Sequence, residues 1–192
     1  MEKFNRCILF SPIGGTDPIS NYRDGAMLHI ARKYKPYKVV MYFSREMYSD
    51  EKKDGRYSAT LRKLGETLSH DFQIELINSD IADVHIFDIF YDKFEKELQR
   101  LHKEDPDADL LLNVSSGTPS MKSALQILAA FAEFDSMLPI QVATPAARQN
   151  VNRGDKTDYD IETEWMCNED NDELKYRDRS FISSNLNLSV RL

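Results

Sequence analysis

Two short glycine-containing segments are the parts of this sequence best suited to chemistry. Residues 14–16 (Gly-Gly-Thr) follow the apolar run 7–10, and residues 116–118 (Ser-Gly-Thr) follow the apolar run 109–114. Glycine leaves main-chain N–H groups unobstructed, and N–H groups at the start of a helix favour an anion. The two segments together therefore predict a phosphate-binding site.

Neither segment matches a common nucleotide-binding motif. No Gly-Lys-Ser/Thr follows the glycines, and Gly14-Gly15 does not extend to Gly-x-Gly-x-x-Gly. Triphosphate hydrolysis and dinucleotide redox chemistry therefore lack their usual sequence features. Each segment by itself is also an ordinary turn, since Ser-Gly-Thr-Pro is a good connection from a strand to a helix. The phosphate hypothesis depends on the two segments meeting at one edge of a sheet.

The elements that would bring them together alternate along the chain. Apolar runs predict five strands, and 3.6-residue periodicity predicts helices between them. We expect strands at 7–10, 37–43, 72–77, 109–114 and 138–144, and helices at 20–34, 45–70 with a break near Gly55, from a cap at Asp88 to about 104, and 120–135. Ser44 and Thr118 are suited to cap helices, the second with Pro119 as the first helical residue.

This alternation predicts the fold class. Five apolar strands separated by helices are typical of an α/β protein with a Rossmann-like, mostly parallel sheet flanked by helices on both faces. The carboxyl ends of parallel strands lie at one edge of such a sheet. Both glycine segments should therefore emerge at that edge.

The sequence changes character after Pro145. Residues 146–158 are polar and predict a loop, where the role of Arg148 and Arg153 is left open. Residues 159–166 alternate and predict an edge strand with a charged face. We expect a Rossmann-like domain over residues 1–167, followed over 168–192 by an acidic connector and a C-terminal edge-strand extension that leads to further chain.

Length and composition limit the class of protein. The chain has 192 residues, of which 41% are hydrophobic and 30% charged, as expected for one globular domain. No apolar run reaches the roughly 18 residues of a membrane helix, and no signal peptide is evident, so we expect a cytoplasmic protein. The net charge of −7 argues against a DNA-binding surface. Cys7 and Cys167 lie far apart and the histidines are scattered, so no metal or other cofactor is expected.

Four ordered motifs make the sequence similar to one family. They are Ser-Pro-Ile-Gly-Gly-Thr-Asp-Pro at 11–18, Asp-Gly-Ala-Met-Leu-His-Ile at 24–30, residues 44–47 with 54–57, and Asn-Val-Ser-Ser-Gly-Thr-Pro-Ser-Met-Lys at 113–122. Over about residues 5–167 the sequence resembles the CARF (CRISPR-associated Rossmann fold) domain of Csm-type accessory ribonucleases in type III-A CRISPR systems.

The resemblance implies a function in antiviral defence. Such domains form homodimers that bind a cyclic oligoadenylate across the dimer axis and activate a HEPN ribonuclease domain in the same full-length chain. Cyclic hexa-adenylate is the first candidate and cyclic tetra-adenylate the second. The alternative is a Rossmann-like dimerisation or regulatory module, like CARF-type transcription regulators, that binds another nucleotide or none.

The resemblance also implies ligand-binding residues in three loops. They are Ser11, Gly14, Gly15 and Thr16 in the first loop, Ser44 and Glu46 in the second, and Ser116, Gly117, Thr118, Ser120 and Lys122 in the third. Lys122 lies one turn inside its helix, so it either reaches a phosphate or stays in solvent.

Two catalytic hypotheses follow. Some members of the family slowly cut the ring. In this reaction a ribose 2′-hydroxyl attacks the neighbouring phosphate, and no metal is needed in principle. Thr118 and Thr16 are the candidates for positioning that phosphate. Arg23 and His29 show the spacing of the HEPN nuclease motif, in which four to six residues separate an arginine from a histidine. At about 100° per residue, these two side chains point to different sides of a helix. We therefore expect no ribonuclease activity from this chain alone.

Overall fold

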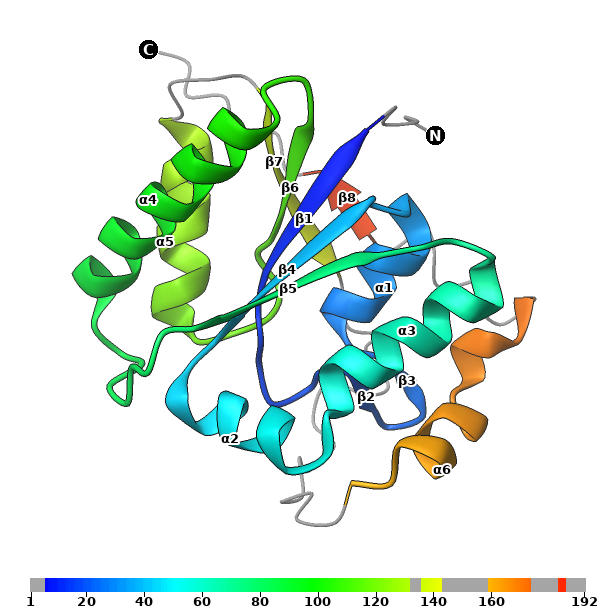
Figure 1. Ribbon diagram of the computed structural model, residues 1–192. Helices are drawn as coiled ribbons and strands as arrows, with labels where there is room; N and C mark the ends of the chain where they lie inside the picture. The colour runs from blue at the N-terminus through cyan, green and yellow to red at the C-terminus, as the bar shows by residue number, and fades with distance from the viewer. Residues whose placement is uncertain (1–5, 132–135, 143–158, 174–182, 186–192) are drawn as a thin grey trace.

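A six-stranded sheet forms the centre of the computed structural model, which describes residues 6–131, 136–142, 159–173 and 183–185 (Figure 1). The strands are β1 (Cys7–Pro12), β4 (Lys38–Phe43), β5 (Gln73–Asn78), β6 (Asp109–Asn113), β7 (Met137–Val142) and β8 (Ser183–Asn185). Their order is β5-β4-β1-β6-β7-β8; the first five are parallel, and β8 runs antiparallel at the edge. The predicted fold class is confirmed.

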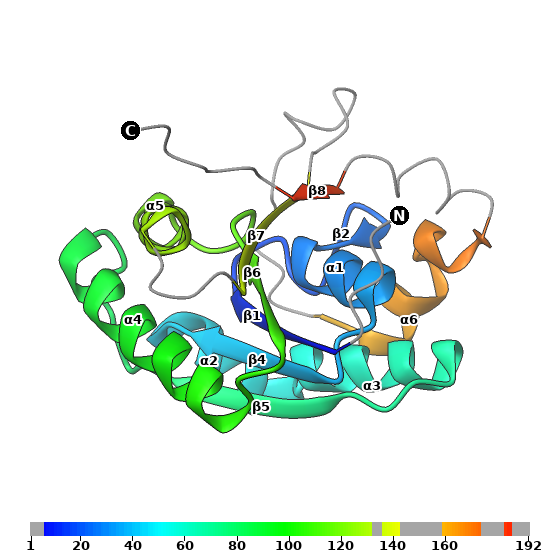
Figure 2. The same cartoon turned by 90° about the horizontal axis from the view of Figure 1, so that it is seen from above.

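Helices cover both faces of the sheet (Figure 2). The helices α1 (Ala26–Tyr34), α2 (Arg45–Asp54), α3 (Arg56–Leu68) and α6 (Ile161–Met166) lie on one face, and α4 (Phe87–Glu104) and α5 (Pro119–Ala130) lie on the other. Side chains alternate along each strand: Leu9 packs toward α1 and α3, whereas Ile8 and Phe10 pack toward α4 and α5. Both cores are therefore built from the same strands.

The helix boundaries follow local signals that the sequence shows. Ser44 caps α2, and Thr118 caps α5 with its Oγ1 accepting from the Met121 N–H at 3.4 Å. Gly55, at φ +70°, separates α2 from α3, as predicted. The predicted cap at Asp88 is wrong by two residues: Ile86 is the cap, and Asp88 lies in the first turn of α4, where its charge still favours the helix dipole.

Two predictions of secondary structure are wrong. Residues 19–24 are not the start of a helix but a hairpin, β2 (Ile19–Ser20) and β3 (Arg23–Asp24), whose turn residues Asn21 and Tyr22 have positive φ. The expected edge strand over 159–166 is α6, because Asp160 accepts from the Thr163 N–H at 2.6 Å and starts a helix.

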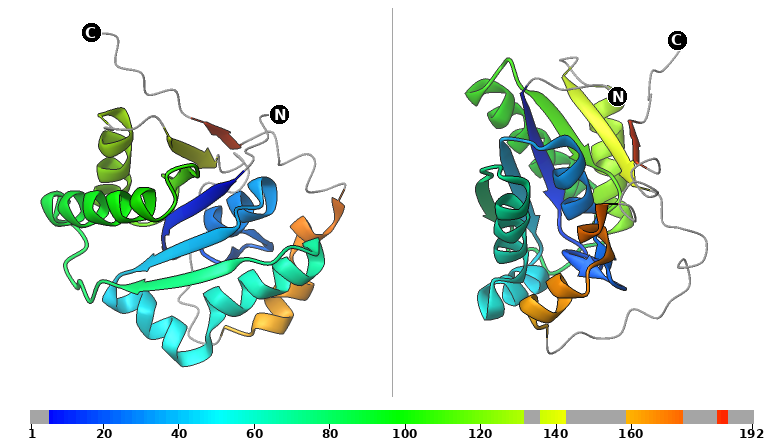
Figure 3. Two further views of the ribbon diagram at one scale, coloured as in Figure 1. Left: turned by 45° about the horizontal axis from the view of Figure 1, so that its top comes forward. Right: turned by 90° about the vertical axis from the view of Figure 1, so that its right-hand side faces the viewer.

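The C-terminal extension agrees in part with the prediction. The strand β8 pairs with β7 through Ile140 and Asn185 at the sheet edge (Figure 3). The predicted loop with Arg148 and Arg153, and the last residues 186–192, lie outside the described residues. Among the described helices, none is long and apolar enough to cross a membrane.

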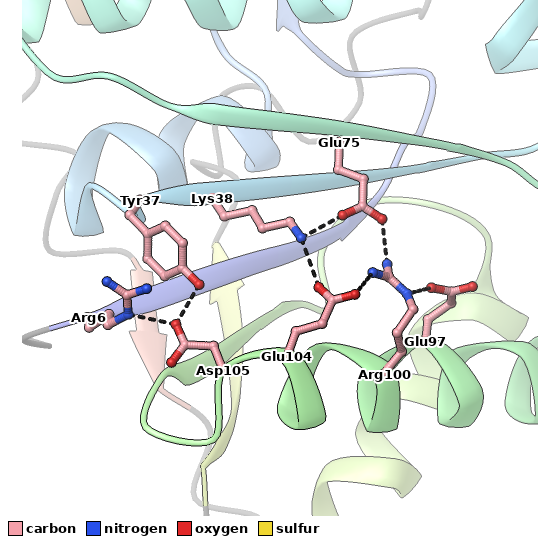
Figure 4. Close-up of polar contacts among 8 residues, drawn as sticks. All are labelled: Arg6, Tyr37, Lys38, Glu75, Glu97, Arg100, Glu104 and Asp105. Carbon is pink, nitrogen blue, oxygen red and sulfur yellow. Dashed lines mark hydrogen bonds and ion pairs between the residues drawn. The ribbon is translucent and has the colours of Figure 1, made fainter.

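Ion pairs hold the end of the sheet where the parallel strands begin (Figure 4). Asp105 accepts from Arg6 Nε and from the Tyr37 hydroxyl, both at 2.6 Å. A second group joins Lys38 and Arg100 to Glu75, Glu97 and Glu104. The charges at this end are thus matched to one another, and the opposite edge, where the strands end, holds the candidate site.

Candidate functional site

The site lies where the chain leaves the two central strands in opposite directions. The strands β1 and β6 are neighbours, with Phe10 beside Leu112. After β1 the chain passes to α1 on one face, and after β6 it passes to α5 on the other. Ligands of open α/β sheets bind at such a switch point, because the loops diverge there and leave a crevice.

The two glycine segments are in direct contact at this point. A Cβ added at Gly14 would lie 2.6 Å from the Gly117 nitrogen and 3.3 Å from its Cα. Gly117 itself has φ +84°, and its own Cβ would lie 2.8 Å from the Met121 sulfur. Glycine is therefore needed at both positions, and the sequence prediction that the segments meet at one edge is confirmed.

Asn113 shapes the loop after β6 from below. Its Oδ1 accepts from the N–H groups of Ser115 at 2.9 Å and Ser116 at 3.3 Å, and its Nδ2 donates to Ser11 Oγ at 2.9 Å. Asn113 and Ser11 are fully buried, and Ser116 nearly so. Ser11 and Ser116 thus lie beneath the loop surface, where they support the site.

Asp17 organises the loop after β1, and the sequence analysis did not include it in the site. Its carboxylate accepts from the Gly14 N–H and from the Met27 N–H at the start of α1, both at 3.1 Å. The Gly14 amide is therefore directed at Asp17, so Gly14 serves the site by allowing the loops to touch.

The charge of Asp17 belongs to the same site. Burial raises the pKa of the Asp17 carboxyl, although the hydrogen bonds from the Gly14 and Met27 N–H groups and the nearby Ser116 hydroxyl favour its charged form. The positive charge of Lys122 also acts to lower that pKa. Lys122 is half-buried, and its effect on Asp17 indicates that it lies within electrostatic reach of the loop after β1.

Gly25 lets α1 start against this loop. A Cβ at Gly25 would lie 2.6 Å from both Asp17 Oδ1 and the Thr16 carbonyl oxygen. The Gly25 N–H also donates to the Pro18 carbonyl at 2.7 Å. The loop after β1, the hairpin and the start of α1 are consequently fixed to one another.

A third segment lies beside the N-terminus of α5 and accepts from two of its side chains. The Thr118 hydroxyl donates to the Val84 carbonyl at 2.7 Å, and the Ser120 hydroxyl donates to the His85 carbonyl at 2.6 Å. Both carbonyls belong to the loop that follows β5. The sequence analysis missed this loop, although any segment after a parallel strand emerges at the same edge.

The remaining donors can hold an anion. Within the described ranges, the N–H groups of Gly15 and Gly117 donate to no acceptor, and Gly15 is exposed. Thr16 is half-buried beside them. These groups, the start of α5 and Lys122 form a donor set suited to phosphate.

The other predicted site residues lie one strand away. Ser44 follows β4 and is buried as the cap of α2, where its Oγ accepts from the Met47 N–H at 3.5 Å. Glu46 is exposed in the first turn of that helix. They share the edge with the glycine segments, but their described contacts do not join them to those segments.

The rejected nuclease pair is also separated in the structure. Arg23 lies in β3 and pairs with Asp170, whereas His29 is fully buried in α1. Among the residues that the structure describes, no group of three or more His, Cys, Asp or Glu side chains could hold a metal ion.

The sequence was also compared with those of known proteins. The family model of the Csm6 CARF domain matches residues 73–180. The chain is 41% identical over 167 residues to the CRISPR system endoribonuclease Csm6 of Mycobacterium tuberculosis and 36% identical over 178 residues to Csm6′ of Streptococcus thermophilus. These matches cover 85% and 90% of this chain.

A solved structure gives the same fold. Enterococcus italicus Csm6 bound to cyclic hexa-2′-fluoro-hexa-dAMP matches 94% of this chain with a TM-score of 0.75 and 30% identity. The present chain spans 41% of that protein, and 39% and 43% of the two curated relatives. The match to each longer protein is therefore to one part of it.

Proposed function

Since this chain belongs to the Csm6 CARF-domain family, we propose that it is a sensor that binds a cyclic oligoadenylate, with cyclic hexa-adenylate first and cyclic tetra-adenylate second. The contact of Gly14 with Gly117 beside the start of α5 carries this proposal. It places two main-chain donor segments where the switch point of the sheet opens. The ligand in the E. italicus structure, a cyclic hexa-adenylate analogue, supports the choice of ring.

The donors of the site suit a polyanion despite the net charge of −7. A hydrogen bond to a charged phosphate contributes about 1.5–3 kcal/mol, and a helix N-terminus adds roughly 0.3–1 kcal/mol. Gly15, Gly117 and the start of α5 can supply several such interactions. A few local donors therefore hold phosphates without a basic surface.

We further propose that two copies of the chain share one ring. A ring of four or six identical nucleotides has rotational symmetry, and a twofold axis gives each half of it an identical site. A dimer doubles the number of donors around the ring.

The ribonuclease belongs to the part of the relatives that this chain does not match. The curated relatives are named endoribonucleases and are longer than this chain. We propose that ring binding controls a HEPN ribonuclease domain of the full-length protein in antiviral defence, and that the present chain leaves linear RNA intact.

We also propose slow ring cleavage as a second activity of the same site. The 2′-oxygen attacks phosphorus, the bond to the 5′-oxygen breaks, and a 2′,3′-cyclic phosphate and a 5′-hydroxyl result. The 2′-hydroxyl proton leaves to solvent, and the 5′-oxygen takes a proton from solvent. Thr118 and Thr16 would position the phosphate, and the Thr118 hydroxyl would exchange its Val84 partner for the ligand.

Calorimetric titration with cyclic hexa-adenylate tests the sensor. We expect binding of one ring per two chains, weakened at least tenfold by Thr118→Ala and by Gly14→Asp, with Thr118→Ser as the matched control that retains the hydroxyl. Cyclic tetra-adenylate and linear hexa-adenylate test ring size and cyclisation. A folded chain that binds none of these nucleotides would instead favour a dimerisation or regulatory module.

Incubation of cyclic hexa-adenylate with the chain in chelator tests the cleavage. Mass spectrometry should detect linear products that end in a 2′,3′-cyclic phosphate, at a rate lowered by Thr118→Ala. An unchanged ring after long incubation would remove the cleavage and leave the sensor.

A further inference from the structure

The acidic segment after α6 is built into the domain. The 3₁₀ turn η2 (Glu169–Asn171) follows Asn168, and the side chains of Asn168 and Asp170 are only 3% and 2% exposed. Figure 3 shows α6 and this turn beside the β2–β3 hairpin. A connector that only faces solvent would not bury a carboxylate, because a buried charge is costly unless it is paired. The buried carboxylate of Asp170 must therefore have partners within the domain.

Asp24 is one centre of a buried polar cluster. Its carboxylate accepts from Arg32 Nε at 2.7 Å and Nη2 at 3.1 Å, and from Asn168 Nδ2 at 2.6 Å. Arg32 Nη2 also donates to Asn171 Oδ1 at 2.9 Å. The bonds from Arg32 and Asn168 thus join α1 and β3 to the C-terminal segment.

Asp170 is the second centre. Its carboxylate accepts from Arg23 Nη1 and from the Asp24 N–H, both at 2.8 Å. The Glu169 N–H donates to the Tyr22 carbonyl at 2.8 Å, and Arg23 Nε pairs with the Glu169 carboxylate at 2.9 Å. Hairpin and C-terminal segment are therefore joined through both main chain and side chains.

The hairpin is continuous with the proposed ligand loop. Pro18, which accepts from the Gly25 N–H, immediately precedes β2, and Asp17 fixes the start of α1. The motif at 24–30, which the ligand site does not use directly, supplies Asp24 and the start of α1. Hydrogen bonds therefore join residues 14–18 to the end of the hairpin and the start of α1.

We propose that the cluster of Arg23, Asp24, Arg32, Asn168 and Asp170, here called the hairpin clasp, transmits ring binding at the first loop to the C-terminal segment 168–173. The inference rests on the proposed function. Two guanidiniums match two carboxylates here: Asp24, Asp170 and Arg32 are buried, and the Arg23 side chain is 23% exposed. Such buried pairs resist partial separation, so the clasp moves as one unit with the hairpin. Such a continuous bonded network is a physical route for coupling.

Amide hydrogen exchange of the chain with and without cyclic hexa-adenylate tests the proposal. In the unmodified chain, ring binding should change exchange over residues 165–173 about threefold or more. Asp170→Ala should abolish that response while the ring still binds within about threefold of its original Kd. Asn171→Ala, at an exposed position, weakens the clasp with less risk to folding and should reduce the response.

Glu162→Ala is the matched control. It removes a carboxylate of α6, just before the C-terminal segment, that pairs with Lys63 of α3 at 2.7 Å and lies outside the clasp. This variant should keep the full response. Ring binding without any change over 165–173, or an unreduced response in Asp170→Ala and Asn171→Ala, would overturn the clasp alone. Failure of the unmodified chain to bind any ring would overturn the proposed function, and the clasp with it.

Discussion

Replacement of Gly14 by alanine tests whether the two glycine loops touch in solution. The added Cβ would lie 2.6 Å from the Gly117 nitrogen, about 0.8 Å closer than the 3.4 Å at which ordinary contact begins. The obstacle is main chain, so no side-chain rotation can relieve it. The loops after β1 and β6 must therefore separate.

The expected loss of stability is that of an overpacked site. Such insertions lower the free energy of unfolding by about 1–3 kcal/mol. For a domain near this length, each kcal/mol changes Tm by roughly 2–4 °C. Thermal unfolding should therefore show a Tm lowered by about 2–12 °C.

Gly15→Ala is the matched control, because nothing lies within 4 Å of the position of its Cβ. Its free energy of unfolding should stay within about 0.5 kcal/mol of the original. Calorimetry on Gly14→Ala should show weaker ring binding, since the donors of the two loops no longer converge. Equal Tm values for the two variants, with unchanged ring affinity in Gly14→Ala, would refute the contact.

Three further predictions concern single side chains. Thr118→Ala should lower the free energy of unfolding by about 1 kcal/mol in urea through loss of the α5 cap, whereas Thr118→Ser should not. Tyr37→Phe removes the hydrogen bond that most strongly lowers the pKa of Asp105. The stability that this bond to the charged carboxylate provides is present above pH ~3.9 and is lost as pH falls through the folded pKa. The penalty of this substitution, about 0.5–1.5 kcal/mol at pH 7, should thus shrink in acid, and a pH-independent penalty would contradict this. Burial raises the pKa of Asp17 in the folded chain. The stability that the protonated carboxyl provides is therefore complete below pH ~3.9 and is lost as pH rises through the folded pKa. Between pH 4 and 8 the unmodified chain should therefore lose stability relative to Asp17→Asn. Urea denaturation measures the free energy of unfolding of both chains, and an increase for the unmodified chain relative to the variant over this range would contradict this.

Signals carried by neighbouring residues explain most of the successful predictions. Thr118 and Pro119 mark the start of α5, and Gly55 marks the break between α2 and α3, because caps and left-handed turns depend on a few adjacent residues. The strands β1, β4 and β6 were predictable because each is apolar enough to be buried on both faces, and the edge strand β5 because its residues alternate in polarity.

The wrong predictions have identifiable causes. The eight residues 159–166 alternate in polarity, yet Asp160 and the acidic residues after it also form a helix start, and that start prevails in α6. The hairpin has two-residue strands, too short for periodicity, and Tyr22 stands where glycine would signal the turn.

The five parallel strands, the caps at Ser44 and Thr118 and the two glycine segments could be predicted from the sequence, because each depends on residues close together in the chain. Tertiary structure alone decided that Gly14 touches Gly117, that Asp17 takes the Gly14 amide, and that Asp170 is buried beside Asp24. The physical reason is distance along the chain. Hydrogen bonds and close contacts between such remote residues exist only after the strand order brings them together, and no local pattern encodes that order.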